Sequence, residues 1–173
     1  RGIPGVGAVV PRVWGYYYDA LTGSNYTMVG FDDRPPFEIE LLEGNLPAGP
    51  AQVAVGEGVA RVRSTGVGHE LILIDSDNLG VVFDVVGVFR SESNILTNDL
   101  VVVRNPDLVD FFGLPNGRAV DLALEVYNPN EIPTVAAQVK RMYPDTRPIA
   151  RNEILRTYDA VFNWRSGMLL TLF

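Results

Sequence analysis

Most of the chain shows the alternating and β-branched apolar runs that are typical of strands. Strands are predicted at residues 6–10, 13–18, 26–31, 37–41, 52–55, 70–74, 81–89 and 100–104. Pro11 separates the first two runs, and because proline donates no ladder hydrogen bond it marks an edge, a bulge or a bend. The polar segment 75–80 between two apolar runs predicts a hairpin loop.

Helical periodicity appears in shorter parts of the chain. Residues 56–64 are predicted to form one helix, and Asn105-Pro106 to open a second, with Asn105 as its cap and Gly113 at its end. The last third reads as strand, helix, strand and helix, at residues 121–127, 128–143, 147–150 and 152–165. A mostly β middle followed by this mixed end predicts an α+β fold.

Length and charge narrow the range of functions. The chain has 173 residues, which suffices for one domain or two small subdomains with a packed core. Its formal net charge of −7 repels phosphate groups, so nucleic acid is an unfavoured partner. The absence of cysteine rules out disulfides, thiolate catalysis and cysteine metal sites.

The polar motifs do not assemble into a catalytic or cofactor site. A triad or a zinc site around His69 needs partners, and the chain has no second histidine and no cysteine. Residues 56–61 imitate a dinucleotide-binding turn, but Arg61 replaces its third glycine, so a tight strand-to-helix turn is the better interpretation. We therefore expect no enzyme activity, no cofactor and no metal.

Two acidic segments are interpreted as solvated. Residues 75–80 resemble the start of a calcium loop, but Leu79 occupies a ligand position and no helices flank the segment. The second segment contains Asp32, Asp33, Glu38, Glu40 and Glu43. Strand alternation places Glu38 and Glu40 on one face, which we expect to be the wet one.

Aromatic side chains gather near both ends of the sequence. Tyr16, Tyr17 and Tyr18 are consecutive on a predicted strand, where alternating side chains cannot all face inward. They are therefore a candidate partner surface. Trp164 and Arg165 precede the apolar segment 166–173 and suit a membrane–water boundary, where amphipathic rings and long cationic side chains reside.

Several stretches, in order, carry a family resemblance. They are Gly-Phe-Asp at 30–32, Leu-Glu-Gly at 42–44, Val-Ala-Val-Gly-Glu-Gly-Val-Ala-Arg at 53–61, Gly-Val-Gly-His-Glu-Leu-Ile-Leu at 66–73 and Phe-Asp-Val-Val-Gly-Val-Phe at 83–89. Together they resemble the extracytoplasmic domain of MacB/FtsX-type ABC transporter permeases. Asn45 and His69 depart from the arginine and the acidic residue usual in the family.

The resemblance implies two subdomains within the α+β fold. Residues 1–31 and 106–165 would form an α/β subdomain made from both chain ends, with its N-terminal part truncated. Residues 32–105 would form a mainly β inserted subdomain. Residues 166–173 would begin a transmembrane helix; the alternative is a segment docked on the domain's own interior.

The family implies a role in a bacterial cell membrane, with this domain on the extracytoplasmic side. It would couple ATP-driven motion of membrane helices to export or release of substrate, through a membrane-proximal coupling helix that carries Tyr158, Phe162, Trp164 and Arg165. The implied partners are a cytoplasmic ABC ATPase, a second permease copy and a periplasmic protein. The alternative function is a periplasmic substrate- or partner-binding module without a coupling role.

Overall fold

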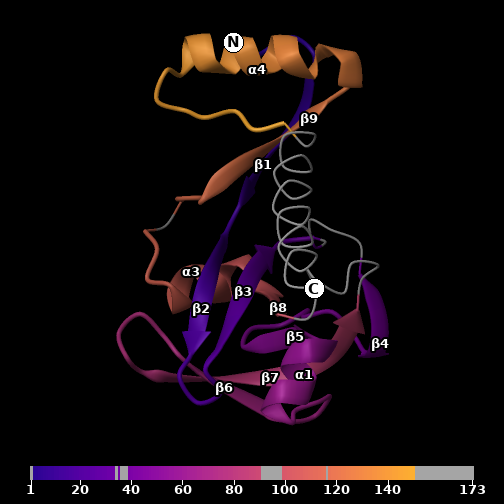
Figure 1. Ribbon diagram of the computed structural model, residues 1–173, viewed down its shortest axis with the longest axis vertical. Coiled ribbons are helices and arrows are strands. Elements are labelled where there is room, and N and C mark those ends of the chain that lie inside the picture. The colour runs from indigo at the N-terminus through magenta and orange to yellow at the C-terminus, as the bar shows by residue number, and fades with distance from the viewer. Residues whose placement is uncertain (1, 34, 36–38, 91–98, 116, 151–173) are drawn as a thin grey trace, which may run out of the picture. The chain divides into compact units, whose positions relative to one another are not determined.

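A computed structural model describes residues 2–33, 35, 39–90, 99–115 and 117–150 (Figure 1). Helices and strands both occur, which confirms the predicted α+β class. The chain divides into two compact units, which are considered separately. Unit 1 comprises residues 1–10 and 123–173, and unit 2 comprises residues 11–122.

A mixed sheet is the frame of unit 2. Among the described residues it has seven strands in the order β2, β3, β8, β5, β7 and β4, with β6 also paired to β7. The strands are β2 Trp14–Asp19, β3 Ser24–Phe31, β4 Glu40–Gly44, β5 Gln52–Gly56, β6 Glu70–Ile74, β7 Gly80–Arg90 and β8 Leu100–Arg104. The pairs β3–β8 and β5–β7 are parallel and the others antiparallel. Strand β2 therefore lies at one end of this order and β4 at the other.

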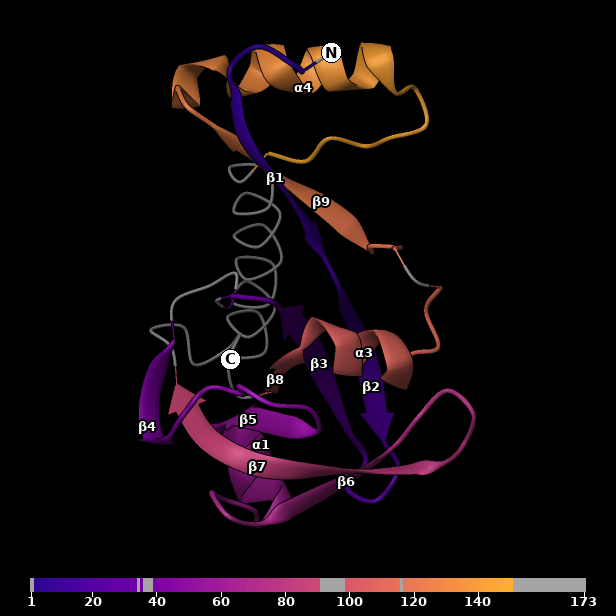
Figure 2. The same cartoon turned by 180° about the vertical axis from the view of Figure 1, so that it is seen from behind.

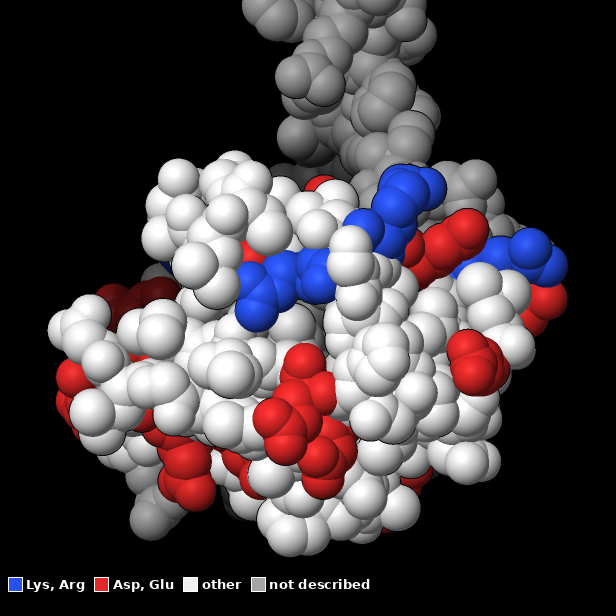
Figure 3. Space-filling view, turned by 90° about the horizontal axis from the view of Figure 1, so that it is seen from below, with Lys and Arg blue, Asp and Glu red and all other residues white. Residues whose placement is uncertain are grey.

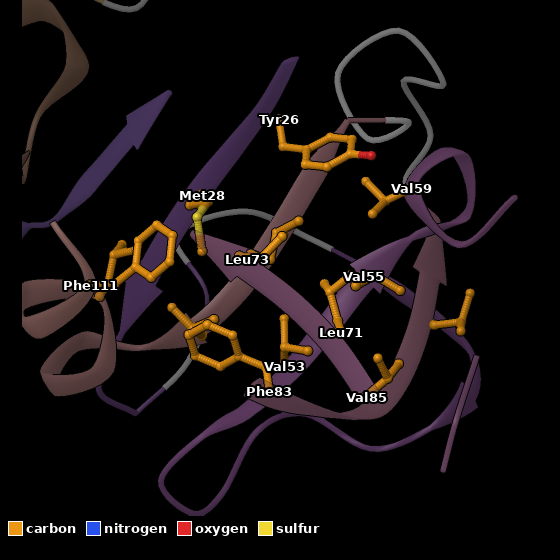
Figure 4. Close-up of a cluster of buried hydrophobic side chains, with 14 of the residues drawn as sticks. Tyr26, Met28, Val53, Val55, Val59, Leu71, Leu73, Phe83, Val85 and Phe111 are labelled. Atoms are coloured by element: carbon orange, nitrogen blue, oxygen red, sulfur yellow. The ribbon is translucent and has the colours of Figure 1, made fainter. Parts of the chain in front are cut away.

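Apolar side chains are buried on both faces of this sheet. Successive strand residues point to opposite faces, so Val101 and Val103 of β8 join one core cluster while Val102 joins another. The larger cluster includes Tyr26, Phe83 and side chains from two helices in the described part of unit 2 (Figure 4). Burial on both faces explains why β8 is a continuous run of valines rather than an alternating strand.

Two short helices pack on the larger cluster. Helix α1, Glu57–Arg63, follows β5 through Gly56, which confirms the predicted strand-to-helix turn. Helix α3 begins at Asn105 itself and ends at Phe111, so the prediction that Asn105 caps it is wrong. Arg104 holds the cap position with extended backbone, and the Asn105 side chain instead donates to Asp32 Oδ2 at 2.8 Å. Gly113 has the predicted positive φ, at 60°.

The described part of unit 1 contains a ladder and one longer helix. Strands β1, Val6–Arg12, and β9, Asp121–Val126, form a two-stranded sheet, and the boundaries between the units fall within these two strands. A 3-10 turn, Pro129–Glu131, leads into helix α4, Ile132–Met142. Ile132, Val135, Ala136 and Val139 form an apolar stripe along α4, and Val135 is its buried member.

The last described segment of unit 1 differs from its prediction. Residues 147–150 are irregular, so the short strand predicted there is wrong. Four apolar and polar residues have weak strand preference unless a neighbouring strand pairs with them. The predicted helix at 152–165 lies outside the described residues.

The unit boundaries fall at other positions than those of the predicted subdomains. Residues 27–31 and 100–104 pair side by side in one sheet, and α3 packs against β3. These contacts place the two segments in the same unit, whereas the expected subdomains would separate residues 27–31 from residues 100–104, which lie inside the insertion expected at 32–105. The division into subdomains that the family resemblance implies stays a prediction.

Candidate functional site

The three tyrosines of β2 face alternately outward and inward. Tyr16 and Tyr18 are 73% and 61% exposed. Tyr17 is half-buried, stacks on Tyr26 with ring centroids 6.2 Å apart, and meets Phe111 edge-on at 5.7 Å. The prediction that the three cannot all face inward is thus confirmed. Two of them, on one face, provide accessible rings, whereas Tyr17 packs against the core cluster.

Trp14 extends the outward face of β2. Its ring lies edge-on to Tyr16, with centroids 5.6 Å apart and an interplanar angle of 87°. On the neighbouring strand β3, Thr27 lies opposite Tyr16 and Asn25 opposite Tyr18. We call Trp14, Tyr16 and Tyr18 the aromatic edge. It carries no charged side chain.

An ion pair joins the end of β1 to the start of β9. Arg12 donates from Nε to Asp121 Oδ1 at 2.6 Å and from Nη2 to Oδ2 at 2.7 Å, and Trp14 Nε1 donates to Oδ2 at 3.1 Å. The backbone adds a hydrogen bond from Val120 N–H to the Arg12 carbonyl at 2.9 Å. We call Arg12, Trp14 and Asp121 the strand clamp.

The clamp is favoured only while Asp121 is ionised. Partial burial raises the pKa of Asp121, but the hydrogen bonds from Arg12 and Trp14, with the positive charge of Arg12, outweigh it and lower the pKa below 3.8. A bidentate guanidinium–carboxylate pair also fixes the relative angle of its two strands. The clamp was missed in the sequence because its ion pair joins residues 109 positions apart.

A second charged group is buried beneath the β2–β3 turn. Asp19 is 1% exposed and accepts hydrogen bonds from Thr22 Oγ1, Tyr26 Oη and the Leu21 N–H. Arg63 of α1 donates to it at 3.1 Å from a side chain that is 11% exposed.

The Asp19 carboxylate is held in its charged form by these donors. Burial raises the pKa of Asp19, yet the hydrogen bonds from Thr22, Tyr26 and the Leu21 amide, with the charge of Arg63, lower it below 3.8 overall. The network ties the β2–β3 hairpin to α1. An aspartate followed by Thr22-Gly23 is a turn signal in the sequence, but nothing there indicates Arg63.

The remaining polar candidates have local structural roles. His69 is exposed. Asp75 Oδ1 accepts from the amides of Asp77 and Leu79 and thereby closes the β6–β7 loop. Within the residues that the structure describes, no group of three or more acidic or histidine side chains is placed to hold a metal ion.

The predicted acidic segment is exposed where it is described. Glu40 of β4 pairs with Arg90 of β7 at 2.9 Å, and Asp32, Asp33 and Glu43 face solvent. Glu38 lies outside the described residues. In Figure 3 acidic side chains occur in separate groups, and a row of basic side chains crosses the same face. This interleaving is typical of an ordinary solvated surface.

A groove of about 530 Å³ lies in unit 2 beside the N-terminal end of α3. Its walls combine apolar residues, Pro11, Val13, Pro106 and Val109, with polar ones, Asp32, Asn105, Asp110 and Arg118. Because the polar groups are of both charge signs, the lining does not select one class of ligand.

The predicted coupling residues Tyr158, Phe162, Trp164 and Arg165 lie outside the described residues. Within the described ranges, the longest helix is far from the length and apolarity required to cross a bilayer, and none qualifies as a membrane span.

Comparison with solved structures defines the class of this fold. The extracellular domain of the noncanonic ABC-type transporter YknZ from Gram-positive bacteria superposes with a TM-score of 0.57 at 14% identity, covering 83% of this chain and 78% of that one. The periplasmic region of MacB from Actinobacillus actinomycetemcomitans gives 0.55 at 12% identity, covering 91% and 78%. The shared fold is that of extracytoplasmic domains of ABC transporters.

The family follows from the sequence itself. The profile of the MacB-like periplasmic core domain matches residues 1–142. No curated protein sequence matches the chain. The chain belongs to the MacB-like periplasmic core domain family, which confirms the resemblance noted in its sequence, and it is an extracytoplasmic domain of a MacB-like ABC transporter.

Proposed function

We propose that this domain is a mechanical, non-catalytic part of a permease, which transmits ATP-driven motion of membrane helices to the extracytoplasmic side. The strand clamp is the observation that supports this role. A cytoplasmic ABC ATPase would supply the energy through the membrane helices of the full-length protein, and two permease copies would work together.

The clamp lies where transmitted motion has to enter unit 2. The chain passes into unit 2 through the end of β1 and leaves through the start of β9. Arg12 and Asp121 tie these two passages together by two short hydrogen bonds, and Trp14 adds a third. A displacement of either strand is therefore passed to the other and to β2, rather than being absorbed by independent movement.

The proposal is tested by a distance measurement in the full-length permease, reconstituted with its ATPase in nanodiscs. Spin labels are placed at Asp77→Cys in unit 2 and Arg141→Cys in unit 1, both exposed positions. We expect vanadate trapping of the ATPase to shift the inter-label distance by ~2 Å or more. Asp121→Ala should reduce or broaden this shift, because it removes the acceptor of all three clamp bonds.

Glu125→Ala is the matched control. It removes the same charge from the same strand, from an exposed side chain outside the clamp, so the trapped-state shift should persist. An unchanged distance after trapping would contradict the coupling role. A shift that survives Asp121→Ala would remove the clamp from the mechanism.

A second candidate function is docking of a partner protein. The exposed rings of Tyr16 and Tyr18 favour it, since aromatic side chains that combine an apolar body with a polar tip are enriched at interfaces. Docking and transmission of motion are compatible in one domain.

A further inference from the structure

Strands β2 and β6 lie beside each other without pairing in the sheet of the described residues. The Tyr17 hydroxyl of β2 accepts a hydrogen bond from the Ile74 N–H of β6 at 3.1 Å. Arg63 forms a second bridge, because it donates to the Ile72 carbonyl at 2.8 Å and to Asp19 of β2 at 3.1 Å. Figures 1 and 2 both show β6 next to the end of β2. Side chains thus close this seam in place of a backbone ladder.

The outward side chains on both sides of the seam are apolar. Tyr17 of β2 and the leucines of β6 pack on the same core cluster, so the residues between them face away from that core. Ile72 and Ile74 are 48% and 47% exposed, and Val82, opposite Ile72 on β7, is 44% exposed. A contiguous exposed patch of large apolar side chains is typical of an interaction site. We call Tyr16, Tyr18, Ile72, Ile74 and Val82 the docking face.

The main chain of β6 is already occupied at the docking face. The Ile72 carbonyl and the Ile74 N–H point away from β7 and are bonded to side chains across the seam. Addition of a partner strand requires open main-chain groups along an edge, so this face does not favour it. A helix satisfies its own backbone groups and needs only side-chain contacts. Gly80, opposite Ile74, has no side chain and leaves room for one from a partner.

Two carboxylates lie at one end of the docking face. Glu70 and Asp84 stand opposite each other at the next outward position beyond Ile72 and Val82. Both are exposed, and neither forms an ion pair with another described residue. Like charges directly opposite each other destabilise a sheet, and a cation brought between them relieves this repulsion. The pair therefore selects a basic partner over an acidic one.

We propose that the docking face binds an amphipathic helix of a partner polypeptide, with lysine or arginine side chains beside its apolar stripe. Residues 70–74 of one strand span about 13 Å, the length of about nine helical residues, so an apolar stripe of two to three turns covers the face. The next turn then brings a basic side chain to Glu70 and Asp84.

The net charge of the chain acts in the same direction. At −7 it attracts a basic polypeptide and repels an anionic membrane surface. The proposal specifies the partner for the docking function given above as the second candidate, and it rests on that function for its role in the permease. Its contacts belong to unit 2 alone.

The test is an NMR titration of the 173-residue chain, labelled at isoleucine and valine methyl groups, with a helical leucine–lysine peptide of about 15 residues. We expect saturable shifts at Ile72, Ile74 and Val82. Val9 and Ile149 of unit 1 are more than half exposed and should not shift. The same peptide with glutamate in place of lysine should bind about tenfold more weakly. Absent shifts, or shifts of similar size in unit 1, would overturn the proposal.

Two pairs of matched variants identify the face. Glu70→Gln with Asp84→Asn should weaken binding of the lysine peptide about fivefold. Glu43→Gln with Asp33→Asn removes the same charge from exposed positions elsewhere and should leave the affinity unchanged.

The second pair adds a charge to an exposed apolar position. Ile72→Lys places a like charge inside the docking face and should weaken binding about tenfold or more. Leu42→Lys makes the corresponding change on β4, at the other end of the sheet, where the side chain is 43% exposed, and should retain binding. Equal affinities within both pairs of variants would contradict the assignment of the face.

Phosphatidylcholine vesicles provide the arm for a lipid surface. Methyl shifts with vesicles but none with the peptide would overturn the choice of a polypeptide. No ATPase is present, so failure of peptide binding is independent of the distance test above. Loss of the trapped-state shift in that test would likewise leave peptide binding intact.

Discussion

Asp19→Asn is expected to lower the free energy of unfolding by about 3–5 kcal/mol, the range for removing one partner of a buried ion pair. The side chains of Asp19 and Arg63 are 2% and 11% exposed, so an unpaired Arg63 cannot regain full hydration without moving α1. Asparagine keeps the shape but replaces one acceptor oxygen by a donor, which in either orientation of the amide faces the guanidinium of Arg63. Urea unfolding followed by near-ultraviolet circular dichroism measures the change.

The same substitution should remove part of the acid sensitivity. Because the folded-state pKa of Asp19 is lowered below 3.8, the unfolded chain binds the proton first as pH falls. The stabilisation is therefore complete above the unfolded pKa and is lost as pH drops from about 5 through the folded pKa. The pKa values of Asp121 and Glu40 are also lowered, so the difference between wild type and Asp19→Asn isolates the contribution of Asp19.

Asp77→Asn serves as the control, because it removes one carboxylate from an exposed loop position. Its free energy of unfolding should stay within about 0.5 kcal/mol of wild type. The decrease of stability at low pH should be the same as in wild type. If both variants lose the same small amount, the Asp19 network is not a stabilising element.

Tyr17→Ala should cost about 3 kcal/mol of unfolding free energy, whereas Tyr16→Ala should change it by less than about 0.5 kcal/mol. Tyr17 packs against Tyr26 and Phe111, and its hydroxyl accepts the Ile74 N–H at 3.1 Å. Tyr16 is 73% exposed. The two substitutions delete the same atoms from neighbouring positions, so their difference measures the alternation of β2 directly.

Urea unfolding of Tyr16→Ala and Tyr17→Ala under the same conditions measures the two free energies of unfolding. Tyr17→Phe separates the hydroxyl from the ring, because it removes only the acceptor for Ile74 and should cost about 1 kcal/mol. Equal losses for Tyr16→Ala and Tyr17→Ala would contradict the orientation of the strand.

Local features of the fold follow from the sequence, and long-range ones do not. The valine run of β8, the turn at Gly56 and the stripe of α4 arise from periodicity and backbone preferences, which neighbouring residues determine. The Arg12–Asp121 and Arg63–Asp19 pairs join residues 109 and 44 positions apart. Their partners are set by the order of strands in the sheet, which no local pattern encodes.

The difference between local and long-range interactions also explains which predictions from the sequence were wrong. Asn105 has the residue type of a cap, but its side chain donates to Asp32 of a distant segment, and the helix begins one residue earlier than predicted. Of residues 147–150 only Ile149 favours a strand, and Pro148 donates no ladder hydrogen bond, so the short strand predicted there does not form. The prediction for Tyr17 was correct, because the alternation of side chains along a strand is a local property. It places Tyr17 and its two neighbours on opposite faces.

The parallel pairing of β3 with β8 has a consequence for how the domain folds during synthesis and export. Residues 27–31 have to wait for residues 100–104 to leave the ribosome and the export channel before they gain their inner neighbour. Contacts of such large sequence separation slow folding and prolong the exposure of strand edges. During this interval the apolar strands of the β2–β3 hairpin are exposed on both faces, because the rest of the sheet has not yet formed. Export of this domain should therefore depend on factors that shield nascent chains from aggregation.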